Sequence, residues 1–373
     1  MLRFLTAGES HGPGLTAILE GMPAGIEVCT EELAQELGRR RKCYGRGPRA
    51  SIENDEVHVT SGIHDGKTTG APIAVFIPNK DYSNWHGKQC PITAPRPGHA
   101  DLPGAIKYGF KDCRPVAERA SARETAARVA CGYFAKKLLR LAGIEVISWV
   151  TQIGETVADL ASRERRMFDP EFARHLAKLA EGSEVRCPDP VASAQMVKLI
   201  DRAREAGDTL GGVFEVAALG VPVGLGSYVH WDRRLDTRLA AAVMSIPGVK
   251  GVEIGLGFQG AALRGSQFHD PIVPNGKSWN VALPVLSRQS NHAGGIEGGV
   301  SNGQLVFIRA ATKPIPTLQC PLPSVDMVTG QRCDAHRERS DVCAVGSAAV
   351  VAEAVVALVL ADALLEMRGG DKW

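Results

Sequence analysis

The sequence predicts an α+β fold in which helices pack against antiparallel sheets. Helical patterns and short strand-like runs both occur, and they follow one another without the strict alternation that is typical of a doubly wound parallel sheet. Turns rich in Gly and Pro, such as residues 221–224, separate the strand-like runs. No internal repeat and no low-complexity linker divides the chain, so we expect one domain over residues 1–373.

Hydrophobic periodicity, with start and stop signals, predicts the helices. Ser121 followed three residues later by Glu124 has the spacing of a capping box, and Gly143 follows the last periodic residue, Leu141. The expected helices are residues 31–41, 121–141, 170–179, 191–206, 234–244 and 347–367. The expected strands are residues 56–60, 73–77, 213–219, 252–254, 281–286 and 305–310.

The apolar segment at residues 342–360 approaches the length of about 20 residues that crosses a bilayer. It contains Glu353, is mostly Ala and Val, and is followed by Asp362. Because ionised side chains are costly in a bilayer, we expect a helix buried between other layers of the protein, without membrane association.

Composition excludes several classes of protein. The chain has 373 residues, 44% of them hydrophobic, and a net charge of +2, which is too small to indicate bulk binding of nucleic acid or membrane. Nine cysteines occur without a C-x-x-C pair, which argues against a disulfide framework and against a metal site. The N-terminus lacks the long apolar stretch of a signal peptide, so we expect a cytoplasmic protein with reduced thiols.

Two histidines lie in glycine-containing loops. His11 belongs to the segment GESHG at residues 8–12, and His99 belongs to RPGHAD at residues 96–101. Histidine has an ordinary pKa of about 6.5, so it exchanges protons near neutral pH, and glycine neighbours allow a ligand to approach the backbone. Either histidine alone could be a hydrogen-bonded loop residue, but the pair together with nearby arginines points to proton transfer on an anionic substrate.

A cationic segment lies between the two loops. Residues 39–49 contain six cations, namely Arg39, Arg40, Arg41, Lys42, Arg46 and Arg49. Arginine binds phosphate and carboxylate bidentately, so this density suits a multiply anionic small molecule. A solvated helix end and an RNA-binding surface are alternative interpretations of the same residues.

A second basic group lies beside the helix expected from residue 121. Free N–H groups at a helix start attract an anion, and Arg119, Arg123 and Arg128 could neutralise it. Alternatively, Ser121 simply caps the helix.

The glycines at positions 255, 257 and 260 match the dinucleotide pattern G-x-G-x-x-G. The preceding strand is short, and Pro271 and Pro274 interrupt the segment that should be a helix, so a nicotinamide-dependent dehydrogenase using Gly255, Gly257 and Gly260 is only an alternative.

Three further segments carry candidate groups. Residues 294–299 are rich in glycine, and residues 313–317 (KPIPT) form a rigid turn with one cation and one hydroxyl. Asp341 stands at the head of the apolar C-terminal helix, where the helix dipole favours an acid.

Five segments together resemble one protein family. They are AGESHG (7–12), YGRG (44–47), RPGHAD (96–101), RASARET (119–125) and RSDVCAV (339–345). With these motifs in this order, the chain resembles the chorismate synthase family from Arg3 to Gly369.

This resemblance implies a carbon–oxygen lyase of the shikimate pathway, which leads to aromatic amino acids. The reaction is the anti-1,4-elimination of phosphate from 5-enolpyruvylshikimate 3-phosphate, giving chorismate, and it requires reduced FMN without net redox change. The family fold is a β-α-β sandwich, with long helices between antiparallel sheets, assembled into a homotetramer. The resemblance leaves open whether NADPH reduces the flavin on this chain or a separate flavin reductase supplies it.

The resemblance also implies roles for individual residues. His11 would protonate the departing phosphate, His99 would protonate or stabilise the reduced flavin near N1, and Asp341 would manage the proton at N5. Ser10 and Ser121 would hold the surroundings of Asp341. Ala120 stands where many members have a second serine, which leaves open which hydroxyl supports the flavin. The implied flavin contacts are Arg119, Ala120, Ser121, Pro247, Gly248, Gly299, Lys313, Pro314, Ile315, Pro316, Thr317 and Arg339. The implied substrate or NADP contacts are Arg40, Arg46, Arg49, Arg123 and Arg128.

Overall fold

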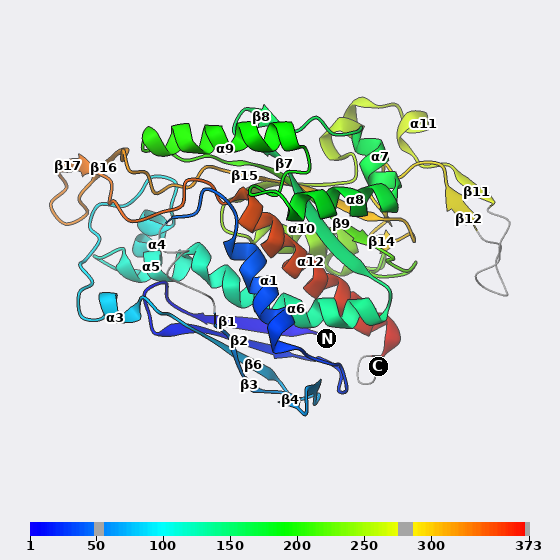
Figure 1. Ribbon diagram of the computed structural model, residues 1–373, viewed down its shortest axis with the longest axis horizontal. Coiled ribbons are helices and arrows are strands. Elements are labelled where there is room, and N and C mark those ends of the chain that lie inside the picture. The colour runs from blue at the N-terminus through cyan, green and yellow to red at the C-terminus, as the bar shows by residue number, and fades with distance from the viewer. Residues whose placement is uncertain (48–55, 275–285, 370–373) are drawn as a thin grey trace.

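A computed structural model describes residues 1–47, 56–274 and 286–369. Its centre is a sandwich in which a layer of helices separates a four-stranded sheet from a five-stranded sheet (Figure 1). Every strand pair in these two sheets is antiparallel. The predicted α+β class and the β-α-β sandwich are therefore confirmed.

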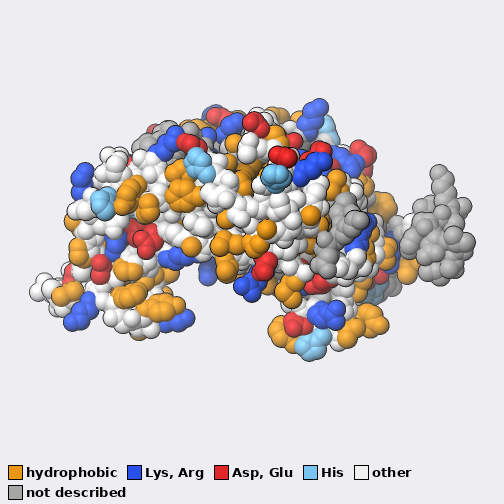
Figure 2. Space-filling model, turned by 90° about the horizontal axis from the view of Figure 1, so that it is seen from below, with side chains coloured by type: hydrophobic (Ala, Val, Ile, Leu, Met, Phe, Trp, Pro, Cys, Tyr) orange, Lys and Arg blue, Asp and Glu red, His pale blue; other side chains and the backbone are white. Residues whose placement is uncertain are grey.

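The four-stranded sheet has the order β1 (Arg3–Gly8), β2 (Gly14–Glu20), β6 (Ile73–Pro78) and β3 (His58–Ser61). Side chains alternate between its two faces, because successive residues of a strand point in opposite directions. Leu15 lies opposite Ile77 and Leu19 opposite Ile73, and all four side chains are buried against the helices. On the outer face hydrophobic side chains lie among polar ones (Figure 2), and Ile18 is exposed there.

The five-stranded sheet has the order β10 (Val249–Ile254), β15 (Val306–Thr312), β9 (Gly212–Leu219), β7 (Glu145–Ile153) and β8 (Thr156–Val157). Helices cover both of its faces, which explains why β9 is buried along most of its length. On the outer face Trp149 and Phe307 pack with α8 (Pro170–Glu181).

The central layer contains α1 (Thr30–Arg41), α6 (Thr125–Leu141), α10 (Leu235–Met244) and α12 (Val345–Arg368). Within the described ranges, α12 is the one helix long and apolar enough to cross a membrane, but 94% of its apolar window is buried inside the protein. The structure thus confirms the predicted buried helix.

The remaining elements are short or peripheral. They are β4 (Ile63–His64), β5 (Lys67–Thr68), α3 (Tyr82–Trp85), α4 (Asp101–Tyr108), α5 (Arg114–Ala120), η1 (Ala122–Glu124), α7 (Arg163–Phe168), α9 (Pro190–Glu205), η2 (Trp231–Arg233), η3 (Gly257–Ala262), α11 (Gly265–Phe268), β11 (Ile272–Pro274), β12 (Leu286–Arg288), β13 (Ile296–Glu297), β14 (Val300–Ser301), β16 (Pro323–Val325) and β17 (Arg332–Asp334).

The sequence prediction for the start of the helix at residues 121–141 is wrong. The helix expected at 121–141 begins at Thr125, because Ser121 has extended backbone and interrupts the chain between α5 and η1. The Ser121 side chain accepts from the Arg123 N–H at 3.4 Å, so the expected capping box with Glu124 does not form.

The glycines at 255–260 lead into a 3₁₀ helix beside an edge strand of an antiparallel sheet, which is not a dinucleotide-binding unit.

In the two main sheets, β1, β2, β7 and β8 were not predicted, and neither were the short strands β4, β5, β11, β13, β14, β16 and β17. Five of the six expected strands are present with small shifts of their ends. The sixth, 281–286, lies outside the described residues except for Leu286, which begins β12.

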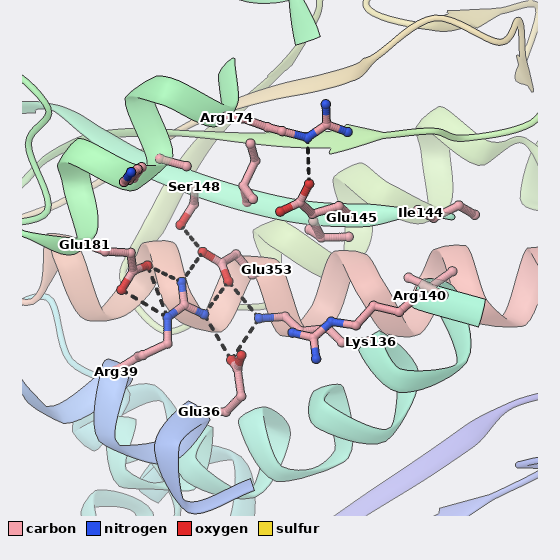
Figure 3. A pocket seen from close by; sticks show the side chains of 15 residues that line it. Glu36, Arg39, Lys136, Arg140, Ile144, Glu145, Ser148, Arg174, Glu181 and Glu353 are labelled. Carbon is pink, nitrogen blue, oxygen red and sulfur yellow. Dashed lines mark hydrogen bonds and ion pairs between the residues drawn. The ribbon is translucent and has the colours of Figure 1, made fainter. Parts of the chain in front are cut away.

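The cationic segment at 39–49 is divided between two sites. The guanidinium of Arg39 binds the Glu353 carboxylate bidentately at 2.7 and 2.9 Å, and it also contacts Glu36 and Glu181 (Figure 3). This ion cluster lines a cavity of about 430 Å³ between α1, α6, α12 and β7. Arg39 is therefore neutralised inside the protein, whereas its neighbour Arg40 faces a different cavity.

Glu353 is the centre of this cluster and is fully buried on α12. Besides Arg39, it accepts from Lys136 Nζ at 2.7 Å and Ser148 Oγ at 2.6 Å, and Arg186 lies at 3.3 Å. Burial alone would raise the pKa of the Glu353 carboxyl, but Arg39 and Lys136 outweigh burial and hold this pKa below its ordinary value. Glu353, the acid that argued against a membrane helix, thus joins α12 to its neighbours through ion pairs.

Candidate functional site

A second cavity, of about 630 Å³, brings together most of the residues singled out in the sequence. The predicted site residues that line it are Ser10, His11, Arg40, Arg46, His99, Ala120, Ser121, Arg123, Pro247, Gly248, Lys313, Pro314, Ile315, Pro316, Thr317, Arg339 and Asp341. They come from segments spread over the chain, so the fold has placed them together.

Four predicted residues are not among those lining the cavity. Arg119 donates to the carbonyl oxygen and Oγ1 of Thr6 on β1. Arg128 pairs with Glu124 and donates to Ser245, which itself lines the cavity.

Gly299 lies between β13 and β14, where an added Cβ would meet Arg234 at 2.6 Å, and it is not brought to this cavity. Arg49 lies outside the described residues.

His11 is held by a buried carboxylate. The loop that carries it joins β1 to β2, and it turns at Gly8, whose φ of +112° favours glycine. His11 Nδ1 lies 2.8 Å from Glu118 Oε1, and the His11 backbone N–H donates to Glu118 Oε2 at 2.6 Å. The ring also packs against Trp85, with 3.9 Å between the ring centroids.

Glu118 remains ionised in this setting. Burial raises the pKa of the Glu118 carboxyl, but hydrogen bonds from the His11 ring and backbone lower this pKa by more, so it lies below its ordinary value. A carboxylate that accepts two hydrogen bonds from one histidine restrains both the ring and the loop.

His99 has a comparable partner in Asp101, the first residue of α4. Its Nδ1 lies 2.6 Å from Asp101 Oδ1. Arg96 binds both oxygens of this fully buried carboxylate, at 2.7 and 3.0 Å, and donates to Thr317. Burial raises the pKa of Asp101, but contacts with His99 and Arg96 outweigh it and hold this pKa well below its ordinary value.

Asp341 is not at the start of a helix, which corrects the sequence prediction. α12 begins at Val345, with Ala344 as its N-cap. Asp341 instead accepts from the Gly47 N–H at 2.7 Å and pairs with Arg46 at 2.8 Å. It therefore ties the loop of residues 44–47 to the segment that precedes α12.

The loop of residues 44–47 needs glycine at this contact. Gly45 has a φ of +91°, and an added Cβ would lie 2.9 Å from Cys343 Cβ. The Val342 N–H donates to the Gly45 carbonyl oxygen at 2.7 Å. The close approach places Arg46 and Asp341 side by side in the cavity wall.

Positive charge predominates in the cavity. Among the residues that the structure describes, eight cations line it, against three carboxylates, Glu118, Glu338 and Asp341. Burial and the neighbouring Lys250 lower the pKa of Lys313, and within the described parts of the chain neither lysine has a carboxylate partner. This wall favours a ligand with several negative charges.

Several residues in this site carried no recognised signal in the sequence. Glu118 lies within α5, the helix beside the motif of residues 119–125, Trp85 lies on the short α3, and Lys250 is the second residue of β10. Glu338 pairs with Arg114, and although burial raises its pKa, His336 and Arg114 lower that pKa to about 2. Glu118 is recognisable as the partner of His11 only from the short distance between the two side chains in the folded chain.

A sequence model of the family described as chorismate synthase matches residues 2–365. The chain belongs to the chorismate synthase family. Three chorismate synthases are similar to this chain over at least 94% of their own lengths. The one from Desulforudis audaxviator is 54% identical over 381 aligned residues, covering 100% of this chain and 94% of the relative.

The relative from Geobacter sulfurreducens is 53% identical, covering 100% of this chain and 95% of the relative, and that from Aquifex aeolicus is 51% identical, covering 99% and 94%. A crystal structure described as that of chorismate synthase superposes with a TM-score of 0.82 at 45% identity, covering 100% of this chain and 94% of the other.

Membership confirms the resemblance drawn from the five motifs. The family consists of carbon–oxygen lyases of the shikimate pathway, and this class applies to the chain. The comparisons do not support the dehydrogenase and RNA-binding alternatives.

Proposed function

We propose that the chain converts 5-enolpyruvylshikimate 3-phosphate to chorismate in the 630 Å³ cavity, by anti-1,4-elimination of phosphate. The observation that carries this proposal is the meeting of two histidine–carboxylate pairs with eight cations in the cavity of a family member. The substrate has one phosphate and two carboxylates, so it matches a wall with excess positive charge. Arg40, Arg46 and Arg123 would bind these anionic groups, or those of NADPH.

The cavity also fits reduced FMN. Met244, Ile246 and Pro247 supply apolar surface for a ring system, and the facing turn 313–317 supplies more. Among the described residues, Arg46 Nε is buried without a hydrogen-bond partner, and Lys313 is a cation without a carboxylate, so both can receive an anionic group. Reduced flavin, when bound, supplies electron density that assists the departure of phosphate.

Residues from four segments of the cavity lining would hold the flavin. They are Ala120, Ser121, Pro247, Gly248, Lys313, Pro314, Ile315, Pro316, Thr317 and Arg339. Ala120 has no hydroxyl, so at this corner Ser121 would make the contact, with Ser10 on the side of His11. We also propose that the chain acts in the cytoplasm as a homotetramer. Its flavin is reduced either by NADPH on this chain or by a separate flavin reductase.

The chain itself supplies proton transfers and charge. His11 would donate a proton to the departing phosphate, with its Nδ1 held by Glu118. His99, held by Asp101, would protonate or stabilise reduced flavin near N1. Asp341, placed by Arg46 and Gly47, would manage the proton at the flavin N5.

The proposal is tested by chorismate formation under anaerobic conditions. We expect product with chemically reduced FMN, and absence of product under these conditions would refute the proposed function. A parallel reaction with NADPH and oxidised FMN distinguishes a chain that reduces its own flavin from one that depends on a separate reductase.

Asp341→Asn is expected to slow elimination with reduced FMN by about 10² or more, the size expected when a proton-transfer group is lost. The amide oxygen can still accept from the Gly47 N–H, whereas the ion pair with Arg46 and the ionisable group are lost. Turnover should be measured beside FMN affinity and thermal unfolding. A variant that folds, binds FMN and turns over at the parent rate would remove Asp341 from the chemistry.

Arg46→Lys is expected to lower kcat/KM by about 10-fold or more, because a charge-assisted hydrogen bond contributes about 1.5–3 kcal/mol and lysine lacks the bidentate geometry. Arg140→Lys is a suitable control, since Arg140 is exposed on α6 and away from this cavity. Steady-state kinetics on both variants checks the prediction. If the two variants perform equally, charge alone suffices at Arg46.

A further inference from the structure

We propose that Glu118 is a positioning residue that sets the tautomer of His11, keeping the proton of the neutral ring on Nδ1 and presenting Nε2 for proton exchange. This inference rests on the proposed role of His11 but concerns a residue outside the recognised motif positions. The two contacts between these residues carry it.

His11 offers two hydrogen-bond donors to Glu118. The His11 backbone N–H and ring Nδ1 both reach one carboxylate, at 2.6 Å to Oε2 and 2.8 Å to Oε1. An ionised carboxylate only accepts hydrogen bonds, so a short contact with Nδ1 requires that Nδ1 carries hydrogen. The low pKa of Glu118, in which the contacts with His11 outweigh burial, supports the ionised form.

The His11 loop and ring are restrained by further contacts. The Ser10 N–H donates to the Glu118 carbonyl oxygen at 3.1 Å, so the backbone of α5 holds the same loop that the side chain holds. Trp85 packs on the His11 ring and limits its rotation. With Glu118 only 4% exposed, water competes weakly for its oxygens.

The tautomer of His11 decides which ring nitrogen exchanges protons. When Nδ1 keeps its hydrogen, the neutral ring has its lone pair on Nε2, and the protonated ring gives up its proton from Nε2. A histidine that must protonate a leaving group and be protonated again needs the same nitrogen for both events. Glu118 meets this need through its two contacts with His11.

The pair of His11 and Glu118 differs from the pair of His99 and Asp101. Arg96 binds both oxygens of Asp101, so this carboxylate divides its charge between an arginine and a histidine. Glu118 also contacts Arg114 at 3.5 Å, but Arg114 makes a shorter contact with Glu338, at 2.5 Å. Glu118 is therefore directed mainly at His11.

Glu118→Gln is the decisive change because it preserves shape but alters the donors. The backbone N–H of His11 cannot become an acceptor, so the Gln oxygen must face it, which turns the amide NH₂ toward Nδ1. Nδ1 must then accept, and the hydrogen of the neutral ring moves to Nε2. The substitution is expected to reverse the tautomer while leaving the loop in place.

The tautomer can be read by magic-angle-spinning NMR of protein labelled with ¹⁵N-histidine, without flavin or substrate. Spectra are taken about two pH units above the ordinary histidine pKa of about 6.5, and the His11 signals among ten histidines are assigned by their loss in His11→Gln. We expect Nδ1–H in the parent chain and Nε2–H in Glu118→Gln. An Nε2–H tautomer in the parent chain would overturn the proposal, even if the variant failed to fold.

Kinetics supply the second readout. Glu118→Gln is expected to lower kcat by about 10²-fold or more, as for loss of a general acid, with a much smaller change in KM. The matched control is Glu253→Gln, another largely buried carboxylate, paired with Arg163 and Arg309 away from the cavity, for which we expect neither effect. Unchanged kcat in Glu118→Gln would refute the positioning role.

The two proposals fail in distinguishable ways. Because the tautomer is measured without flavin or substrate, failure to form chorismate would leave the NMR result standing. Conversely, an active parent chain with the Nε2–H tautomer would retain the proposed function and reject only the role of Glu118.

Discussion

His11→Ala is expected to lower kcat by 10²- to about 10⁴-fold, the range typical of a general acid, while KM changes much less. His11 lines the cationic cavity and is held there by Glu118 and Trp85, so removing its ring takes away the proton donor and leaves the anion-binding groups in place. Steady-state kinetics under anaerobic conditions with reduced FMN measures both constants.

His230→Ala is the control for this substitution. His230 also pairs with a carboxylate, Asp232, but it is exposed and does not line the cavity. Circular dichroism and thermal unfolding should accompany the kinetics, because His11→Ala leaves Glu118 with fewer partners. Parent-like turnover in a folded His11→Ala would exclude His11 from the mechanism.

Glu353→Gln is expected to reduce the free energy of unfolding by about 3–5 kcal/mol, the usual cost of breaking a buried ion pair from one side. The amide leaves Arg39, Lys136 and Arg186 facing one another with less compensation in the middle of the helical layer. Denaturant unfolding measures the change. Glu171→Gln, at an exposed ion pair on α8, is expected to cost less than about 1 kcal/mol.

The same cluster predicts a pH dependence of stability. Burial raises the pKa values of Glu353 and Glu181, but their cationic partners outweigh it, so both lie below the ordinary range. A depressed pKa stabilises the folded state above the unfolded pKa, about 4.3 for Glu, and this stabilisation is lost as pH falls toward the folded value. Stability of the parent chain should therefore fall more steeply on acidification than that of Glu353→Gln, and parallel curves would contradict this.

Much of the site was predictable because its motifs are local. His11, His99, Arg46 and Asp341 lie in short segments whose glycines and charges signal ligand contact before any fold is known. The structure places all four at one cavity.

Other predictions depended on neighbours that the sequence does not reveal. Arg39 and Arg40 are adjacent and chemically alike, yet on a helix adjacent residues point about 100° apart, so one enters the Glu353 cluster and the other the cationic cavity. Ser121 has the spacing of a capping box, but extended backbone at this residue separates α5 from η1.

The sequence by itself determined the family, the α+β class, the buried apolar helix and the motif residues, because these follow from local patterns of apolar, glycine and charged residues. Tertiary structure alone decided which carboxylate holds each histidine, that Asp341 pairs with Arg46 instead of capping α12, and that Glu353 is buried among cations. These contacts join residues distant in sequence or brought together by turns, and their energies depend on burial and distance, which exist only once the chain has folded.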